Sequence, residues 1–350
     1  MADESDHEDE GAELDPRIEA AWQALEAGEV AEARRRAEAL EPGSPEALLL
    51  AAACFREEGE AEQAIATLRR AIAADPEWAT PELWLGEILA GDPEAAEEAL
   101  AHAERALDLA EEEDEFLAAA TLKATLEVEL GETDAARETL AELPPPDVRL
   151  EDLELALEIA DLHLAVGEPE TARARLRVLC EANPDSADAW HALGCAAEDL
   201  GDEAERRSAW KRTWSLDAAP GAAERLGGDR LPEAEVAAVA DAALEELPPR
   251  ARELLAGIPM VIAELPAEAD VEAGLDPRAL GLFSGTAHGD GGAGLGGQPG
   301  LTQILLFRRN LERMAVDEDD LREEIRTTLL HETGHFFGLS DAALDELGLG

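Results

Sequence analysis

The sequence His331-Glu332-Thr333-Gly334-His335 has the residue types and spacing that point most directly to chemistry. Residues four apart project from the same face of a helix, so both imidazoles can bind one Zn²⁺. Glu332 lies one position along, close enough to take a proton from water at the metal. The alternative is a surface helix that carries two histidines by chance.

The residues after His335 extend this motif to HExxHxxGxxD. Gly338 can adopt a positive φ, end the helix and turn the next residues back towards the metal. Catalytic zinc needs three protein ligands and one open position, and Asp341 stands at the spacing of a third ligand. The other interpretation is that Asp341 caps a short final helix over 341–347.

The expected chemistry is hydrolysis. Zn²⁺ would lower the pKa of its water, Glu332 would take the proton, and hydroxide would attack a carbonyl, with an amide as the expected target. The tetrahedral oxyanion would need a second donor beside the metal, for which His288 and Arg308 are the candidates. His288 lies in a glycine-rich stretch, so the alternative is an ordinary surface histidine.

The flanking sequence predicts a small α+β domain that positions these residues. The motif ends a helix predicted over 317–337, with Asp317 as its cap and apolar residues at helical spacing. A further helix is predicted over 233–247, and strands over 258–263, 281–283 and 302–307. The last strand offers either an exposed edge to an extended peptide or part of the core.

The preceding sequence repeats itself at roughly the tetratricopeptide spacing. In the unit that starts at Pro45, Gly59 separates two segments, and the residues expected to face inward are Leu48, Ala51, Ala52, Phe55, Ala64, Leu68 and Ala71. We predict about six such helix pairs, with an irregular helical bundle as the alternative. The third unit, around Trp84, and the fourth, before Pro144, depart from the pattern. Glycines punctuate the whole region at Gly28, Gly59, Gly91, Gly131, Gly167 and Gly201.

These patterns divide the chain into four parts. Residues 1–13 are acidic and have almost nothing to bury, which predicts a disordered tail. The helical repeats are predicted over 14–219 and the α+β domain over 231–350. Glycine and proline pairs in 220–230 break the helical pattern and predict a linker.

Composition limits the classes of partner. The chain has 28 Lys and Arg against 82 Asp and Glu, a formal net charge of -54, so we expect no nucleic acid, no anionic membrane and a preference for basic partners. No basic and apolar leader and no membrane-length apolar run occurs, so we expect the cytoplasm.

Other residues of ligand type are scattered through the repeats. Three cysteines without CxxC spacing indicate neither a disulfide framework nor a cysteine metal site. His102, His163 and His191 each stand apart from other histidines and are predicted to be packed or surface residues.

At two places the sequence resembles known families. The segments GLFSG, TQILLFRR and TLLHETGHFFGLSD resemble zincin-like minimal bacterial metallopeptidases, over about Leu231 to Gly350. This resemblance implies a small sheet beside the active-site helix, one Zn²⁺ held by His331, His335 and Asp341, and Glu332 as catalytic base. The chain departs from many metallopeptidases in having no Tyr to assist the oxyanion.

The front of the chain resembles the tetratricopeptide repeat family, with the W-x2-L-G pattern at Trp190, Leu193 and Gly194. That resemblance implies a surface for a peptide or protein partner.

Two functions follow from this organisation. The first is a zinc-dependent peptidase whose repeats recruit a protein partner or substrate. The second is a non-catalytic adaptor with a structural or vestigial zinc site. Glu332 favours the peptidase, because a purely structural zinc site needs no base beside its ligands.

Overall fold

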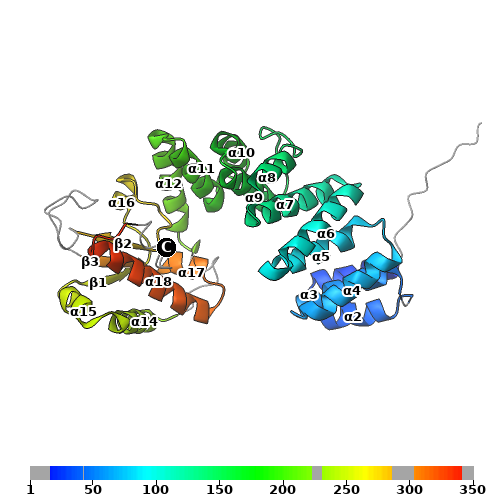
Figure 1. The fold of residues 1–350 in the computed structure, drawn as a ribbon, viewed down its shortest axis with the longest axis horizontal. Helices are drawn as coiled ribbons and strands as arrows, with labels where there is room; N and C mark the ends of the chain where they lie inside the picture. The colour runs from blue at the N-terminus through cyan, green and yellow to red at the C-terminus, as the bar shows by residue number, and fades with distance from the viewer. Residues whose placement is uncertain (1–15, 42, 223–230, 286–302, 341–350) are drawn as a thin grey trace, which may run out of the picture. The chain divides into compact units, whose positions relative to one another are not determined.

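The computed structural model describes residues 16–41, 43–222, 231–285 and 303–340 (Figure 1). The predicted acidic tail and most of the predicted linker lie outside these residues, and the predicted domain limits stay a prediction. The chain divides into two compact units, residues 1–168 and 169–350, and each is described by itself. Among the described helices, none is both long and apolar enough to cross a bilayer.

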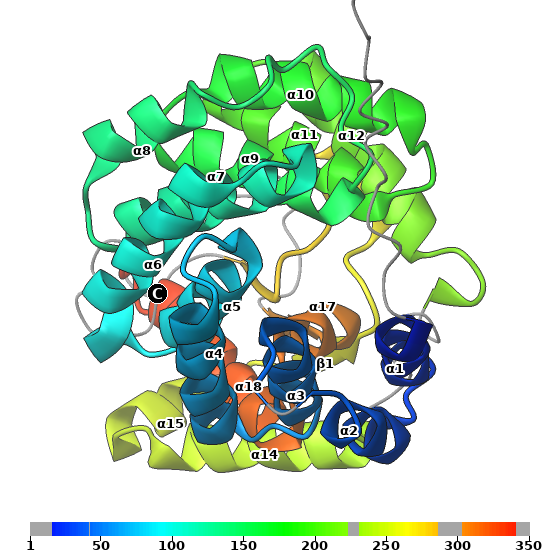
Figure 2. The same ribbon diagram turned by 90° about the vertical axis from the view of Figure 1, so that its right-hand side faces the viewer.

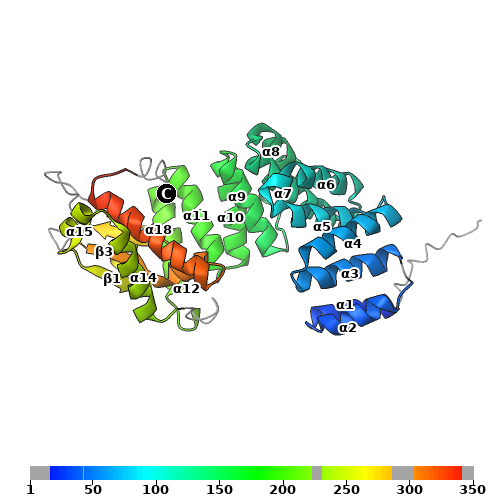
Figure 3. The ribbon, with the colours of Figure 1, turned by 60° about the horizontal axis from the view of Figure 1, so that its bottom comes forward.

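The first unit is built from antiparallel helix pairs. The first eight helices form four pairs, in which each helix contacts its partner and successive pairs contact one another, and the ninth helix contacts the last pair, so the helices stack in chain order (Figure 3). This arrangement confirms a repeat solenoid rather than an irregular bundle. The helices are α1 (Pro16–Glu26), α2 (Val30–Glu38), α3 (Pro45–Glu57), α4 (Ala61–Ala74), α5 (Ala79–Ala90), α6 (Ala96–Leu109), α7 (Glu113–Glu129), α8 (Thr133–Leu140) and α9 (Leu153–Ala165).

The pair α3 and α4 shows why the sequence folds in this way. The Ser44 hydroxyl accepts the Ala47 amide and caps α3. Gly59 has φ 71°, a left-handed conformation that costs glycine little, and it turns the chain into α4. On α4 the inward face is made of small and branched residues, and the predicted Ala64, Leu68 and Ala71 are all fully buried.

The pair α5 and α6 departs from the regular repeat, as its sequence predicts. Gly91 has φ -69°, so it ends α5 without the left-handed turn, and the 3-10 helix η1 (Pro93–Ala95) follows. Gly86 lies against α6, where an added Cβ would be 3.3 Å from the Ala99 carbonyl oxygen. A Cβ at this position would be tightly packed against α6, so glycine favours the close approach of the two helices.

The second unit begins with three more repeat helices, α10 (Pro169–Ala182), α11 (Ala187–Asp199) and α12 (Glu203–Asp217). The W-x2-L-G residues lie on α11, which packs against α12. An added Cβ on Gly194 would lie 2.0 Å from Cδ1 of Trp210, far inside van der Waals contact. The Trp210 indole therefore fills the space that a side chain at Gly194 would need.

A small α+β domain completes the second unit. Its strands pair in the order β1-β3-β2, parallel between β1 and β3 and antiparallel between β2 and β3. The three predicted strands and both predicted long helices are present, while the three short helices were not predicted. The elements are α14 (Glu233–Glu246), α15 (Pro249–Leu255), β1 (Met260–Ala263), α16 (Glu268–Glu272), β2 (Gly281–Ser284), β3 (Gln303–Phe307), α17 (Arg308–Met314) and α18 (Glu318–Phe336).

The strand order corrects one expectation. Strand β3 is paired on both sides, so the prediction that it offers an exposed edge to a peptide is wrong, and its alternative, a strand of the core, holds. In the described sheet the edges are β1 and β2. The side chains of Ile304 and Leu306 on β3 are buried.

The core of the α+β domain lies between the sheet and its helices. Helix α18 contacts β2, β3, α14 and α17, and Figures 1 and 2 both show α14 beside it. The apolar face predicted for this helix is the face that is buried. The fully or nearly buried residues are Leu231, Val236, Ala240, Ala243, Leu255, Ile304, Leu306, Leu311, Ala315, Leu321, Ile325, Leu329 and Phe336.

Polar contacts join the last repeat helices to this domain within the second unit. Asp217, buried at the end of α12, pairs with Arg313 at 2.8 Å and with Arg278 at 3.4 Å. Trp214 Nε1 donates to the Pro266 carbonyl oxygen at 2.9 Å. A buried carboxylate with two guanidinium partners is costly to break, so these contacts fix α12 on the domain.

We predict that Gly194→Ala destabilises the second unit by about 1–3 kcal/mol, the usual cost of overpacking, because the new methyl group must displace the Trp210 indole. Urea unfolding followed by tryptophan fluorescence measures this. Gly257→Ala is the matched control, because its added Cβ has no neighbour within 4 Å. Equal stability of the two variants would contradict the packing described for α11 and α12.

Candidate metal centre

Helix α18 positions the motif predicted to bind zinc. The Asp317 carboxylate accepts the amides of Asp319 and Asp320 at 2.9 Å and starts the helix. Leu321, Ile325 and Leu329 are buried at four-residue intervals and fix the rotation of the helix on the domain core. The last turn therefore presents the HExxH residues in a set orientation.

The two motif histidines converge. His331 Nε2 and His335 Nε2 lie 2.9 Å apart, and the rings meet edge to face with centroids 4.6 Å apart. His335 Nδ1 lies 3.2 Å from the Leu339 carbonyl oxygen, a contact that orients the ring. Two nitrogens bound to one tetrahedral zinc lie about 3.4 Å apart, from Zn–N bonds of 2.0–2.1 Å. The pair thus fits a zinc ion after a small separation of the rings.

Glu332 points away from solvent and is held by strand β2. Its side chain is 8% exposed, and its Oε2 accepts the Phe283 amide at 2.5 Å. The strand can come this close because it begins with glycine: an added Cβ on Gly281 would lie 2.9 Å from Glu332 Cγ and 2.9 Å from Thr328 Cγ2. The carboxylate next to the histidines is therefore fixed by contacts from outside its own helix.

The helix ends as the sequence predicts. Gly338 has φ 81°, and the amides of Gly338 and Leu339 donate back to His335 and Gly334 carbonyl oxygens. This is the glycine-terminated cap that reverses the chain. Asp341 and His288 lie outside the described residues, so the third ligand and this oxyanion candidate stay predictions.

Arg308, the other oxyanion candidate, has a structural contact instead. Its side chain is buried at the start of α17. The guanidinium pairs with the Glu264 carboxylate at 2.9 Å, and it donates to the Leu231 carbonyl oxygen at 3.4 Å. These contacts tie α17 to the loop after β1.

A hollow of about 290 Å³ lies beside the motif and is lined by both α18 and the start of β2. Its lining includes His331 and Glu332 from α18 and Ala279, Leu280 and Gly281 from the other segment. The hollow is thus lined by apolar residues before and at the start of β2 together with the motif residues His331 and Glu332.

All three repeat histidines have a carboxylate neighbour, which for His102 and His163 agrees with a structural role. His102 Nδ1 lies 2.5 Å from Glu82 Oε2, and His163 Nδ1 lies 3.0 Å from Glu168 Oε2. His191 differs, because Cys195 and Asp276 gather around it. The sequence prediction missed this group, although the spacing of His191 and Cys195, four apart on a helix, is a signal for it.

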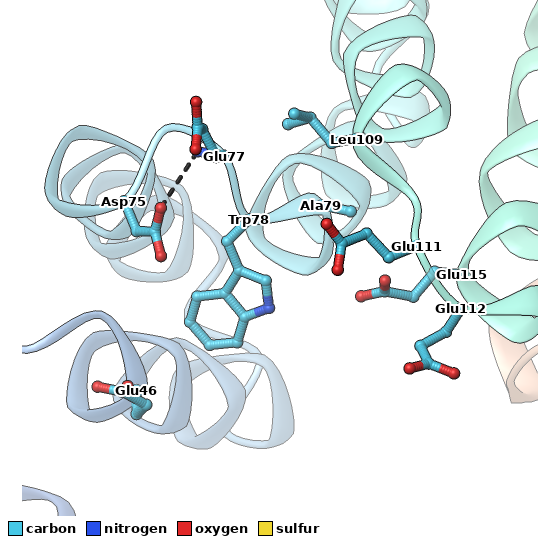
Figure 4. A pocket seen from close by; sticks show the side chains of 9 residues that line it. All are labelled: Glu46, Asp75, Glu77, Trp78, Ala79, Leu109, Glu111, Glu112 and Glu115. Atoms are coloured by element: carbon cyan, nitrogen blue, oxygen red, sulfur yellow. Dashed lines mark hydrogen bonds between the residues drawn. The ribbon is translucent and has the colours of Figure 1, made fainter. Parts of the chain in front are cut away.

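A second hollow, of about 510 Å³, lies in the first unit between successive helix pairs (Figure 4). The Trp78 indole stands at its centre, with carboxylates around it and no basic residue in its lining. The lining residues are Glu46, Asp75, Glu77, Trp78, Ala79, Leu109, Glu111, Glu112 and Glu115.

Comparison with protein families places two kinds of domain on the chain. Residues 255–350 match the model of the zincin-like metallopeptidases. Residues 24–85 and 153–194 match tetratricopeptide repeat models. No curated protein matches the chain.

The similar solved structures are repeat proteins. A Pseudomonas aeruginosa pilF structure is 20% identical, with a TM-score of 0.47, over 61% of this chain and 96% of that one. A Thermus thermophilus tetratricopeptide protein is 21% identical, with a TM-score of 0.40, over 53% and 97%. The C-terminal part of a Cytophaga hutchinsonii repeat protein is 16% identical, with a TM-score of 0.46, over 60% and 82%. The chain thus carries a zincin-like metallopeptidase domain preceded by tetratricopeptide repeats.

Proposed function

We propose that this protein is a zinc-dependent peptidase whose repeat region holds a protein partner or substrate. The observation that carries the proposal is the placement of Glu332. It is buried beside two converging imidazoles and is oriented by a backbone amide of a neighbouring strand. A zinc ion that only holds a fold together gains nothing from a fixed carboxylate next to its ligands.

In this proposal His331, His335 and Asp341 would hold one Zn²⁺, which would supply an activated water and polarise the scissile carbonyl. Glu332 accepts the proton of the attacking water and passes it to the leaving amine. The Phe283 amide holds the Glu332 carboxylate in place, so the base is in position before substrate arrives. The hollow between α18 and β2 accommodates the substrate chain, for which β2 is the neighbouring edge strand.

The repeat region provides the second part of the function. Tetratricopeptide repeats bind protein, and the acidic hollow around Trp78 is suited to a basic side chain. A Lys or Arg there gains attraction from the surrounding carboxylates and a cation–π contact with the indole. We therefore propose a partner with an exposed basic segment.

Glu332→Gln keeps the shape of the side chain but removes the base. We expect zinc content to stay nearly unchanged and hydrolysis of unfolded protein or peptide to fall by roughly a hundredfold or more, the scale of general-base assistance. Metal analysis and a protease assay on the same preparation measure both. Equal hydrolysis by the variant, or no hydrolysis by the zinc-loaded wild type with its partner, would favour the adaptor function.

Removing the proposed ligands should remove metal from this centre. His331→Ala and His335→Ala should each lose one equivalent of zinc, and Asp341→Ala should weaken zinc retention at the same centre. Equilibrium dialysis against a zinc chelator measures retention. Glu346→Ala is the control for Asp341, because it removes a late acid at a different distance from His335. An equal loss in these two variants would assign Asp341 to a capping role.

The acidic hollow should bind basic peptide. Changing Glu111, Glu112 and Glu115 to Gln should weaken binding of an arginine-rich peptide by about tenfold, at ~0.5 kcal/mol for each exposed charge pair. Isothermal titration at low salt measures this. The control changes Glu129, Glu132 and Glu138, which are exposed but do not line the hollow, to Gln. Equal weakening in both variants would show general charge attraction alone.

A further inference from the structure

A second group of metal-ligating side chains lies on the last repeat, where α11 contacts the loop that follows α16. His191 and Cys195 project from one face of α11, and Asp276 comes from the loop. His191 Nε2 lies 2.9 Å from Asp276 Oδ1, and Cys195 Sγ lies 3.9 Å from the same nitrogen. One imidazole, one thiol and one carboxylate thus share a small volume.

The spacing of these atoms suits a single ion. Zinc bonds of 2.0–2.3 Å in a tetrahedral arrangement place neighbouring ligand atoms about 3.4–3.6 Å apart. The observed separations lie on either side of that range, and all three ligand atoms lie within 4.8 Å of one another. The distances from His191 Nε2 to Asp276 Oδ1 and to Cys195 Sγ each differ from that range by about half an ångström or less, and side-chain rotation can adjust the three positions.

Charge and burial favour a divalent cation at this place. All three side chains are half-buried, so a bound ion would be shielded from bulk water. A thiolate, a carboxylate and a neutral imidazole carry two negative charges, which one divalent ion neutralises. The Arg278 amide donates to Asp276 Oδ1 at 2.7 Å and holds the carboxylate towards His191.

The ligand types select among metals. A set of sulfur, nitrogen and oxygen donors prefers a borderline ion such as Zn²⁺ over Mg²⁺ or Ca²⁺, which favour oxygen donors alone. Three protein ligands leave the fourth position of a tetrahedral ion for water. The alternative is a plain hydrogen bond between His191 and Asp276, but that bond alone would not explain why the Cys195 thiol lies beside it.

We propose that His191, Cys195 and Asp276 form a second zinc site, which ties the last repeat to the zincin-like domain. Cys195 and His191 belong to α11, whereas Asp276 lies in the loop that leads to β2. A bound ion therefore crosslinks the two folds within the second unit. The site is separate from the HExxH motif and does not depend on the proposed peptidase activity.

Cobalt substitution distinguishes the two centres, because the HExxH motif offers no sulfur. The full chain is stripped of metal and titrated with Co²⁺ alone. We expect two equivalents to bind and a near-ultraviolet sulfur-to-cobalt charge-transfer band to develop with one of them. Absence of that band in the wild type at saturating Co²⁺ would overturn the proposal without any variant.

Variants assign the band to residues. Cys195→Ser should abolish it and remove one equivalent of metal, and Asp276→Asn should weaken binding at this site by more than about tenfold. Cys180→Ser is the control, because burial raises the pKa of the Cys180 thiol to about 12 and disfavours the thiolate. A band that survives Cys195→Ser or vanishes in a folded Cys180→Ser variant would contradict the assignment.

The double variant His331→Ala and His335→Ala separates this proposal from the peptidase. It should lose hydrolysis and one equivalent of Co²⁺ yet keep the sulfur band. In this background Zn²⁺ should still raise the melting temperature, and the added Cys195→Ser change should cancel that rise. No Zn²⁺ effect on melting in the double variant would contradict a crosslinking ion.

Discussion

The contact between strand β2 and helix α18 is the interaction on which the candidate metal centre depends. Gly281 has no side chain, so the strand approaches Thr328 and Glu332 to a distance that any Cβ would prevent. This approach brings the Phe283 amide to the Glu332 carboxylate. A buried carboxylate needs such a partner, because an unpaired charge in the interior is costly. One missing side chain thus allows both the burial and the orientation of the proposed base.

A second constraint operates where α12 meets the zincin-like domain. Asp217 is buried with Arg313 and Arg278 as partners. Separating the last repeat from the zincin-like domain would leave this buried carboxylate without those partners, which is costly. Asp276 lies at the same contact and has a pKa below its usual value. Burial alone would raise this pKa, but the hydrogen bond and charge of His191, together with Arg278, lower it by more. The last repeat is therefore part of the unit that contains the metal centre.

Sequence patterns predicted what depends on local periodicity. Leu321, Ile325 and Leu329 set the buried face of α18, Gly338 set its end, and small residues such as Ala64 set the repeat packing. Sequence patterns could not predict which distant segments contact one another. The Phe283 contact with Glu332 joins residues 49 apart, and that of His191 with Asp276 joins residues 85 apart. The strand order was missed for the same reason, because register and neighbour choice depend on tertiary packing.

The proposed hydrolysis requires a zinc ion held by His331 and His335, with Glu332 left free of the metal as a base. A crystal structure of the zinc-loaded protein, with anomalous scattering recorded at the zinc edge, tests this directly. We predict an anomalous peak about 2.0–2.1 Å from Nε2 of both histidines. The Glu332 carboxylate should lie outside the coordination sphere and should still accept the Phe283 amide. The absence of a peak at these two histidines, or a zinc bond to Glu332 with loss of the Phe283 contact, would contradict the proposed chemistry.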